Sequence, residues 1–191
     1  MRLADKNNCC GCGACANACR FDAIHMNKNK FGYLYPEYNA NKCVDCGLCT
    51  KSCPVLNYEN KSEDIAYYAG HIKQINKLQK TASGGAATTI SEMFIQLFSG
   101  VVVGCKYDNN NYNCYHEVCS SIDDLNKISG TKYIQSEKKD IFSIINKLLK
   151  QNKKVLFIGT PCEVAALSTF LKAHNEKNIG NLYSCDFICH G

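Results

Sequence analysis

Eight of the fifteen cysteines fall into two runs that share one spacing. Each run reads C-x2-C-x2-C-x3-C, and Pro54 follows the second run. Three thiolates from one tight loop can bind three corners of an iron–sulfur cubane, and the fourth cysteine, one turn further on, ligates the other cluster. We therefore predict two [4Fe-4S] clusters with crossed ligands. The first set is Cys9, Cys12, Cys15 and Cys53, and the second set is Cys43, Cys46, Cys49 and Cys19.

A pair of zinc sites is the alternative interpretation, because C-x2-C pairs also bind zinc. Zinc ribbons use separated pairs, whereas this chain has two runs of four, so we favour clusters. Gly11, Gly13 and Gly47 lie next to predicted ligands, where the backbone must pass close to inorganic sulfides. Cys10 is left over from the pattern, and we predict that it is a packing residue.

The residues Thr160-Pro161-Cys162-Glu163 lie between a short apolar run and an expected helix. Thr160 suits the N-cap, Pro161 the first helical position, and Glu163 completes a capping box. The end of a buried strand followed by a helix N-terminus can bind an anion such as a pyrophosphate. The positive end of the helix dipole should also favour the thiolate of Cys162. A well-capped helix without a further function is an equal alternative.

Two further segments could contact a phosphate. Ser83-Gly84-Gly85 precedes an expected helix, although glycines also simply begin helices. Gly130-Thr131-Lys132-Tyr133 combines flexible backbone, a cation and an aromatic ring. Such a set could hold a phosphate and cover a planar ring, and an ordinary surface turn would have the same composition.

The remaining pattern alternates apolar runs with amphipathic segments. It predicts strands at 65–72, 101–107, 113–119, 155–158 and 182–188, and helices at 85–98, 121–130, 138–151 and from 161. In the helix at 85–98, Ala86, Ile90, Met93, Phe94 and Leu97 share one face. This alternation predicts an α/β domain with a partly parallel sheet over residues 61–191, after an α+β ferredoxin-like dicluster module over residues 1–60. A polar segment, 57–64, separates the two, and the chain stops directly after its last expected strand, so we expect a truncated C-terminal part.

Composition and charge exclude several function classes. The formal charge of +5 falls to about +1 once eight thiolates and two cluster cores are counted, and the lysines form no stripe with aromatics. We therefore expect no nucleic-acid partner. The sequence has no apolar run long enough to span a membrane and no export signal, which favours a cytoplasmic location and metal ligation over disulfides.

Four motifs together resemble the beta subunits of coenzyme F420 hydrogenases and dehydrogenases. They are SGGAAT at 83–88, GTKYIQS at 130–136, KVLFIGTPCEVAAL at 154–167 and CDFICHG at 185–191. They occur in the order and spacing of that family, and the resemblance covers essentially the whole chain, including its N-terminal part. Members of the family are typically considerably longer than this chain.

The resemblance implies an FAD in the α/β domain that exchanges electrons with the clusters. Flavin is stable in one- and two-electron states and so connects single-electron clusters with a two-electron acceptor. The implied acceptor is the deazaflavin coenzyme F420 or another two-electron molecule, and the implied protein partner is a redox protein or a hydrogenase- or dehydrogenase-type subunit. The implied FAD contacts are Ser83, Gly84, Gly85, Thr88, Lys132, Tyr133, Thr160 and Pro161.

Three residues are candidates for chemistry beside the flavin. Cys162 and Cys189 could each line the flavin, act as a redox thiol or ligate a further cluster, and His190 could donate a proton. The leading hypothesis is thus an iron–sulfur flavoprotein oxidoreductase. The competing hypotheses are a pure electron carrier whose α/β domain only docks a partner, and an iron–sulfur interaction module without redox turnover.

Overall fold

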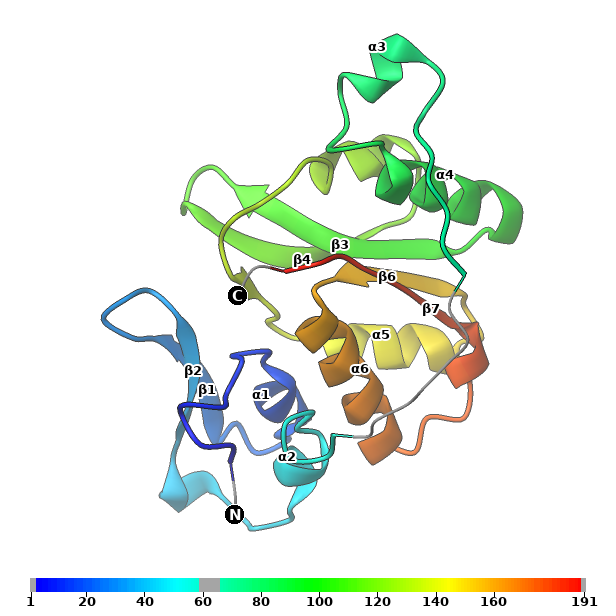
Figure 1. Ribbon diagram of the computed structural model, residues 1–191. Coiled ribbons are helices and arrows are strands. Elements are labelled where there is room, and N and C mark those ends of the chain that lie inside the picture. The colour runs from blue at the N-terminus through cyan, green and yellow to red at the C-terminus, as the bar shows by residue number, and fades with distance from the viewer. Residues whose placement is uncertain (1–2, 59–65, 190–191) are drawn as a thin grey trace.

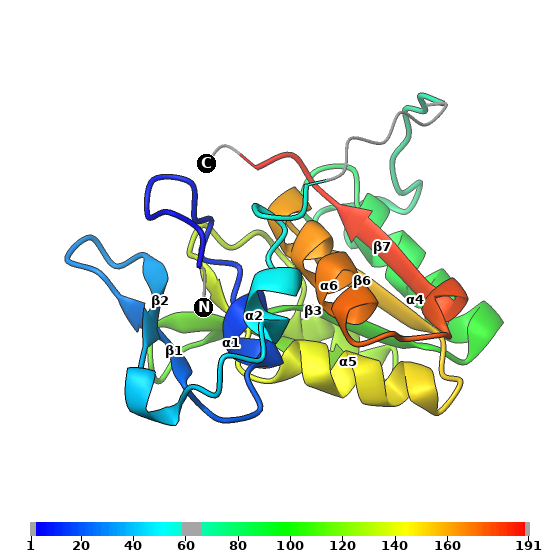
Figure 2. The same ribbon diagram turned by 90° about the horizontal axis from the view of Figure 1, so that it is seen from below.

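The computed structural model describes residues 3–58 and 66–189. A five-stranded sheet forms the middle layer, with α4 on one face and α5 and α6 on the other (Figure 1). The N-terminal module lies against α5 and α6, through contacts from its helices α1 and α2. Figure 2 shows α1 and α2 beside α6 in the second view, so the module is adjacent to the helical face of the sheet that carries α5 and α6.

The N-terminal module consists of two short helices and a hairpin. Its elements are α1 (Ala14–Ala18), β1 (Ile24–Lys28), β2 (Leu34–Tyr38), a 3-10 turn (Ala40–Lys42) and α2 (Leu48–Lys51). The hairpin is antiparallel. Gly13 and Gly47 precede the two helices with φ of 75° and 72°, a left-handed conformation that strongly favours glycine. Each helix therefore begins directly after a loop that carries predicted cluster ligands.

The α/β domain has a mixed sheet in the order β5-β4-β3-β6-β7. The pair β3/β4 is antiparallel, and the pairs β3/β6, β6/β7 and β4/β5 are parallel, which confirms the predicted partly parallel sheet. The elements are α3 (Ile75–Leu78), α4 (Ala86–Phe98), β3 (Val101–Asp108), β4 (Asn113–Cys119), a 3-10 helix (Asp123–Lys127), β5 (Ser136–Glu137), α5 (Ile141–Lys150), β6 (Val155–Gly159), α6 (Pro161–Ala173), a 3-10 turn (Ile179–Asn181) and β7 (Leu182–Asp186).

Two apolar clusters cover the two faces of the sheet. Alternation along β3 sends Val103 toward α5 and α6 and Val102 toward α4. The larger cluster packs Phe142 and Phe170 against Phe157 of β6. Strands 101–107, 113–119 and 155–158 were thus predicted correctly, because β6 and the first half of β3 are buried apolar runs and β4 alternates.

The N-terminal module shares the larger cluster with the α/β domain. Ala14 and Ala18 of α1 are fully buried within it. Asn17 of α1 accepts a hydrogen bond from Phe142 N (3.2 Å) and donates one to Lys139 O (2.7 Å), so it caps the start of α5 from another element. Thr169 of α6 donates to Ser52 O (2.7 Å). These contacts fix the cluster-binding loops relative to the sheet.

Three sequence-based predictions about elements need correction. Residues 66–72 form no strand; Ile72 N instead donates to Gly84 O (3.0 Å), so this segment packs on the turn before α4. The expected helix at 121–130 is only the short 3-10 helix named above, and β7 ends at Asp186. The predicted domain boundary at residue 60 lies in the segment 59–65, outside the described residues.

The apolar face predicted for α4 is largely exposed. Phe94 is buried, but Ile90, Met93 and Leu97 keep exposed fractions of 43%, 50% and 67%. The helix contacts the sheet through a narrow side that includes Ser91, whose hydroxyl is satisfied by Ala87 O (2.7 Å). The apolar positions were identified correctly, but the sheet covers only part of that face.

Candidate functional site: two cysteine cavities and the carboxyl edge of the sheet

The first predicted ligand set lines one cavity. Cys9, Cys12, Cys15 and Cys53 all contribute to its wall, together with Cys10. The cavity is otherwise apolar, with residues such as Met26 and Val55 in its lining. Cys53 therefore lies with the first run of cysteines, although it belongs to the second run in sequence.

The second predicted set lines a separate cavity. Its wall contains Cys19, Cys43, Cys46 and Cys49. The two sets of lining residues match the crossed assignment made from spacing, with Cys19 and Cys53 exchanged between runs. Among residues 3–58 and 66–189, no group of three or more His, Cys, Asp or Glu side chains is arranged to hold a single metal ion.

Burial and the proximity of other thiols raise the pKa values of two predicted ligands. Burial raises the pKa of Cys15 to about 12, and the proximity of Cys9, Cys53 and Cys49 adds to that increase. Burial likewise raises the pKa of Cys49, with Cys19 and Cys46 adding to it. Four thiolates close together in an apolar cavity are unfavourable without a compensating charge, and a cationic iron–sulfur core supplies one.

Backbone amides point at two of the second-set sulfurs. Ala23 N donates to the Sγ of Cys19 and Asp45 N donates to the Sγ of Cys43, both at 3.3 Å. Hydrogen bonds to ligand sulfurs stabilise the more negative, reduced state of a cluster and so raise its reduction potential. These two backbone amides would therefore raise the reduction potential of a cluster bound in the second cavity.

Gln135 ties the first cysteine loop to the α/β domain. Its amide nitrogen donates to Cys10 O (3.3 Å) and Gly11 O (3.4 Å), and its oxygen accepts from Leu34 N (2.7 Å). A Cβ at Gly11 would approach the Gln135 amide nitrogen to 2.3 Å, and the φ of Gly11 is +65°, so this position requires glycine. Gln135 lies within the GTKYIQS segment, and sequence analysis gave it no role of its own.

Cys162 occupies the first turn of α6, as predicted, but its thiolate is not favoured. The capping box is present, with Thr160 N donating to the Glu163 carboxylate (2.9 Å). The pKa of Cys162 is raised well above its usual range, mainly by an interaction with the thiol of Cys10 and secondly by burial. The hydroxyl of Thr160, which lies 3.1 Å from Sγ, lowers this pKa by a smaller amount. The helix dipole is outweighed because the neighbouring group is another thiol.

A buried polar network lies directly behind this turn, and sequence analysis did not find it. Lys138 Nζ donates to Glu163 (2.5 Å) and to Ser136 O (2.7 Å), and His116 contacts the Ser136 hydroxyl (2.8 Å). Burial and the charge of Lys138 lower the pKa of His116 to about 4. Burial alone would raise the pKa of Glu163, but the charge of Lys138 and its hydrogen bond hold it below its usual value. The network is therefore a neutral histidine beside a Lys–Glu ion pair.

The segments assigned to FAD gather at one edge of the sheet. Thr160 follows the carboxyl end of β6, and the turn 83–85 precedes α4, which runs back along the sheet into β3. The first hydrogen bond within α4 runs from Thr89 N to Gly85 O (3.0 Å). The amides before it, including that of Thr88, therefore belong to the N-terminus of the helix, which lies at this edge of the sheet. The backbone of Gly84 lies against residues 70–72.

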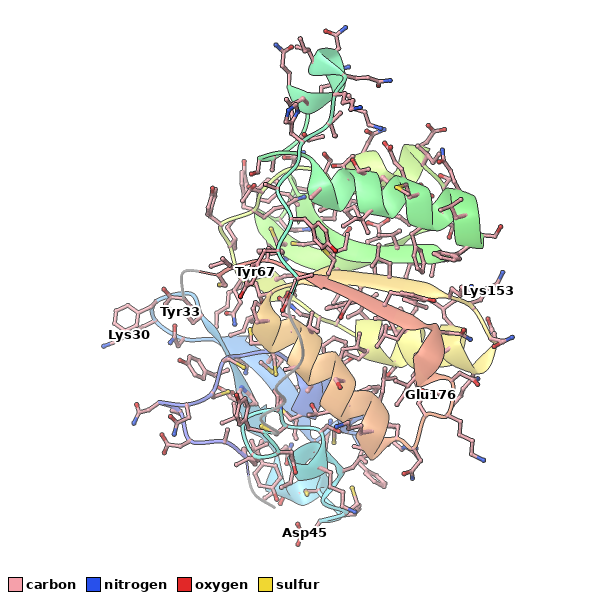
Figure 3. All side chains as sticks on the ribbon, turned by 45° about the vertical axis from the view of Figure 1, so that its right-hand side comes forward. Lys30, Tyr33, Asp45, Tyr67, Lys153 and Glu176 are labelled. Carbon is pink, nitrogen blue, oxygen red and sulfur yellow. The ribbon has the colours of Figure 1, made fainter. Side chains whose placement is uncertain are left out.

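Two of the expected FAD residues are arranged differently from the prediction. Lys132 Nζ donates to three backbone carbonyls, of Ile128 (2.7 Å), Ser129 (2.7 Å) and Gly130 (3.0 Å), so it closes its own loop. Tyr133 is 94% exposed and covers nothing in this structure. An open depression, larger than the two cysteine cavities, lies around α3 and is lined by residues 73–77 and Lys80. Neither Lys132 nor Tyr133 is among its lining residues. Figure 3 shows side chains over the whole molecule, with sulfur atoms gathered in the N-terminal module.

Of the two other predicted catalytic residues, Cys189 is the last residue that the structure describes. Cys189 follows β7 and is exposed. His190 lies outside the described residues. The expected contribution of these two residues to a flavin site stays a prediction.

The comparisons with known proteins agree with the cysteine geometry. Two models of 4Fe-4S dicluster domains match, one over residues 3–59 and one over residues 38–121. The second match continues beyond the cysteine loops through β3 and β4. No curated protein matches the chain. No helix in the described parts of the chain is both long and apolar enough to cross a membrane. The chain thus carries an N-terminal dicluster ferredoxin-like region followed by an α/β domain with a mixed sheet, and such 4Fe-4S domains indicate a role in electron transfer.

Proposed function

We propose that this chain is an iron–sulfur oxidoreductase component that passes electrons from two [4Fe-4S] clusters to a two-electron acceptor at the carboxyl edge of the sheet. The observation that carries the proposal is the pair of cysteine cavities. Cys9, Cys12, Cys15 and Cys53 would hold one cluster, and Cys19, Cys43, Cys46 and Cys49 would hold the other. The clusters supply single electrons.

The position of the first cavity favours transfer into the α/β domain. Its loop is held by Gln135, which donates to the backbone oxygen of Cys10, and the helix α1 that follows the loop contacts both α5 and α6. In sheets with parallel strands, ligands bind outside the carboxyl ends of those strands. An electron leaving the first cavity would therefore enter the α/β domain on the side that carries α5 and α6.

FAD is the cofactor that we propose for that edge, with coenzyme F420 or another two-electron molecule as the final acceptor. The turn before α4 and Thr160-Pro161 would hold its phosphates, because both lie where helices begin. Lys132 does not fit this role while it binds the three carbonyls of its own loop. Flavin binding would therefore require either movement of that loop or a phosphate site that excludes Lys132.

Flavin content separates the proposal from a pure electron carrier. Protein purified anaerobically is expected to release FAD on denaturation, at about one per chain, in addition to iron and sulfide. A variant that replaces Gly85 with Ala should retain its iron but lose flavin, because a Cβ at Gly85 would lie 2.3 Å from Ile72 and distort the turn. Iron–sulfur absorbance with no flavin, even after incubation with FAD, would favour the carrier whose α/β domain only docks a partner.

A further inference from the structure

A buried ion pair lies between the first cysteine loop and the start of α6. Lys138 donates from Nζ to the carboxylate of Glu163 (2.5 Å), and the exposed fractions of the two side chains are 2% and 10%. The methylene groups of Lys138 pack on the loop, because a Cβ at Gly13 would lie 3.3 Å from their carbon atoms. Gly13 lines the first cavity. Lys138 therefore contacts the wall of the proposed first cluster site from the side of the α/β domain.

Both members of the pair carry a charge. Burial would raise the pKa of Glu163, but the charge of Lys138 and its hydrogen bond hold it below its usual value, so the carboxylate is ionised at neutral pH. His116 lies 3.7 Å from this carboxylate, and burial together with Lys138 lowers the pKa of His116 to about 4. The histidine is therefore neutral at pH 7. Two opposite charges are thus fixed in an interior where little water screens them.

The contacts of the pair hold both charges in place. Lys138 also donates to Ser136 O (2.7 Å), and Glu163 also accepts a hydrogen bond from Thr160 N (2.9 Å). A buried ion pair gives little net stability compared with well-packed apolar residues of similar volume. The stability of the fold therefore does not explain why charged side chains lie beside the first cavity.

We propose that Lys138 and Glu163 together set the reduction potential of the cluster in the first cavity. This inference rests on the proposed function, because it requires the clusters. Reduction adds one electron to a [4Fe-4S] cluster and makes it more negative by one charge. The positive charge of Lys138 stabilises that reduced state, and the negative charge of Glu163 destabilises it. Neither residue is a cluster ligand, so the pair acts on the potential through its electric field.

The second cluster supplies a reference within the same molecule. Its cavity is lined by residues from the range 18–49, and Gly13 is not among them. Because the interaction between charges weakens with distance, the pair acts more strongly on the first cluster than on the second. A change in the pair should therefore alter the difference between the two potentials.

The test measures midpoint potentials. Anaerobic redox titrations, followed by electron paramagnetic resonance, are carried out on the whole protein and on a Cys19→Ser/Cys43→Ser variant that keeps only the first cluster. Lys138→Met should lower the potential of the first cluster, and Glu163→Gln should raise it. The potential of the second cluster should move less in both variants.

Opposite shifts separate a charge effect from damage to the structure. Each single variant leaves a buried group without its charged partner, so a purely structural effect would move the potential in the same direction in both. The double variant Lys138→Met/Glu163→Leu should return the potential toward that of the wild-type protein. Lys127→Met is the matched control, because Lys127 forms an exposed ion pair with Asp124, and it should leave both potentials unchanged.

Iron content separates failure of this inference from failure of the proposed function. Lys138→Met and Glu163→Gln should each retain about eight irons, because neither residue is a ligand. Shifts of the same sign, or no shift in either variant, would overturn the inference while the clusters remain. Glu163→Gln keeps the shape of the side chain, so an unchanged or lowered potential in this variant overturns the inference even if Lys138→Met does not fold. A wild-type protein without iron and acid-labile sulfide would overturn the proposed function itself.

Discussion

Replacing Cys12 and Cys53 together is expected to leave about four irons per chain, whereas replacing Cys43 and Cys53 together is expected to remove nearly all eight. The reason is the crossed division of the ligands between the two cavities. Cys12 and Cys53 line the same cavity, so losing both damages only one cluster. Cys43 and Cys53 line different cavities, so losing both damages two. Iron and acid-labile sulfide in anaerobically purified variants give the measurement.

The reciprocal pair supplies the control. Cys19 with Cys43 should behave like Cys12 with Cys53, and Cys19 with Cys12 should remove both clusters. If each sequence run instead holds its own cluster, every one of these results reverses, because Cys12 and Cys53 would then belong to different clusters. Serine replacements keep the size of the side chain and limit effects on packing.

Replacing Lys138 with Met is expected to lower the free energy of unfolding by about 3–5 kcal/mol. Lys138 is nearly inaccessible and pairs with Glu163, so its loss leaves a buried carboxylate with too few partners. The side chain also packs against Gly13 in the first cysteine loop. Urea denaturation of the holoprotein under anaerobic conditions, followed by circular dichroism, should show a lower midpoint with an unchanged slope.

The same substitution at an exposed ion pair serves as the matched control. Lys127 pairs with Asp124 at 2.7 Å, but both side chains are substantially exposed. Lys127→Met should cost no more than about 1 kcal/mol. Replacing Lys138 with Met and Glu163 with Leu together should recover part of the loss, because no unpaired charge remains buried. Equal losses at Lys127 and Lys138 would contradict the buried network.

Local spacing predicted the parts of the structure that depend on near neighbours. The capping box at Thr160 and Glu163 follows from residues three positions apart. The buried strand β6 was equally visible as a short apolar run. In each case the physical cause acts within a few residues, so the sequence contains it directly.

The parts that sequence analysis missed depend on contacts between distant segments. Asn17 caps a helix that begins more than a hundred residues later, and Gln135 bonds to Cys10 and Leu34 across a comparable separation. The pairing of Cys10 with Cys162 raises the pKa of Cys162, which reversed the expectation from the helix dipole. No local pattern specifies which side chains meet when the module packs on the sheet.

The central claim is that eight cysteines hold two [4Fe-4S] clusters, and metal analysis of anaerobically purified protein tests it most directly. We predict about eight irons and eight acid-labile sulfides per chain, with a broad absorbance near 400 nm that decreases on reduction by dithionite. About two zinc ions per chain with no acid-labile sulfide would contradict the claim, and with it the proposed path of electrons into the α/β domain.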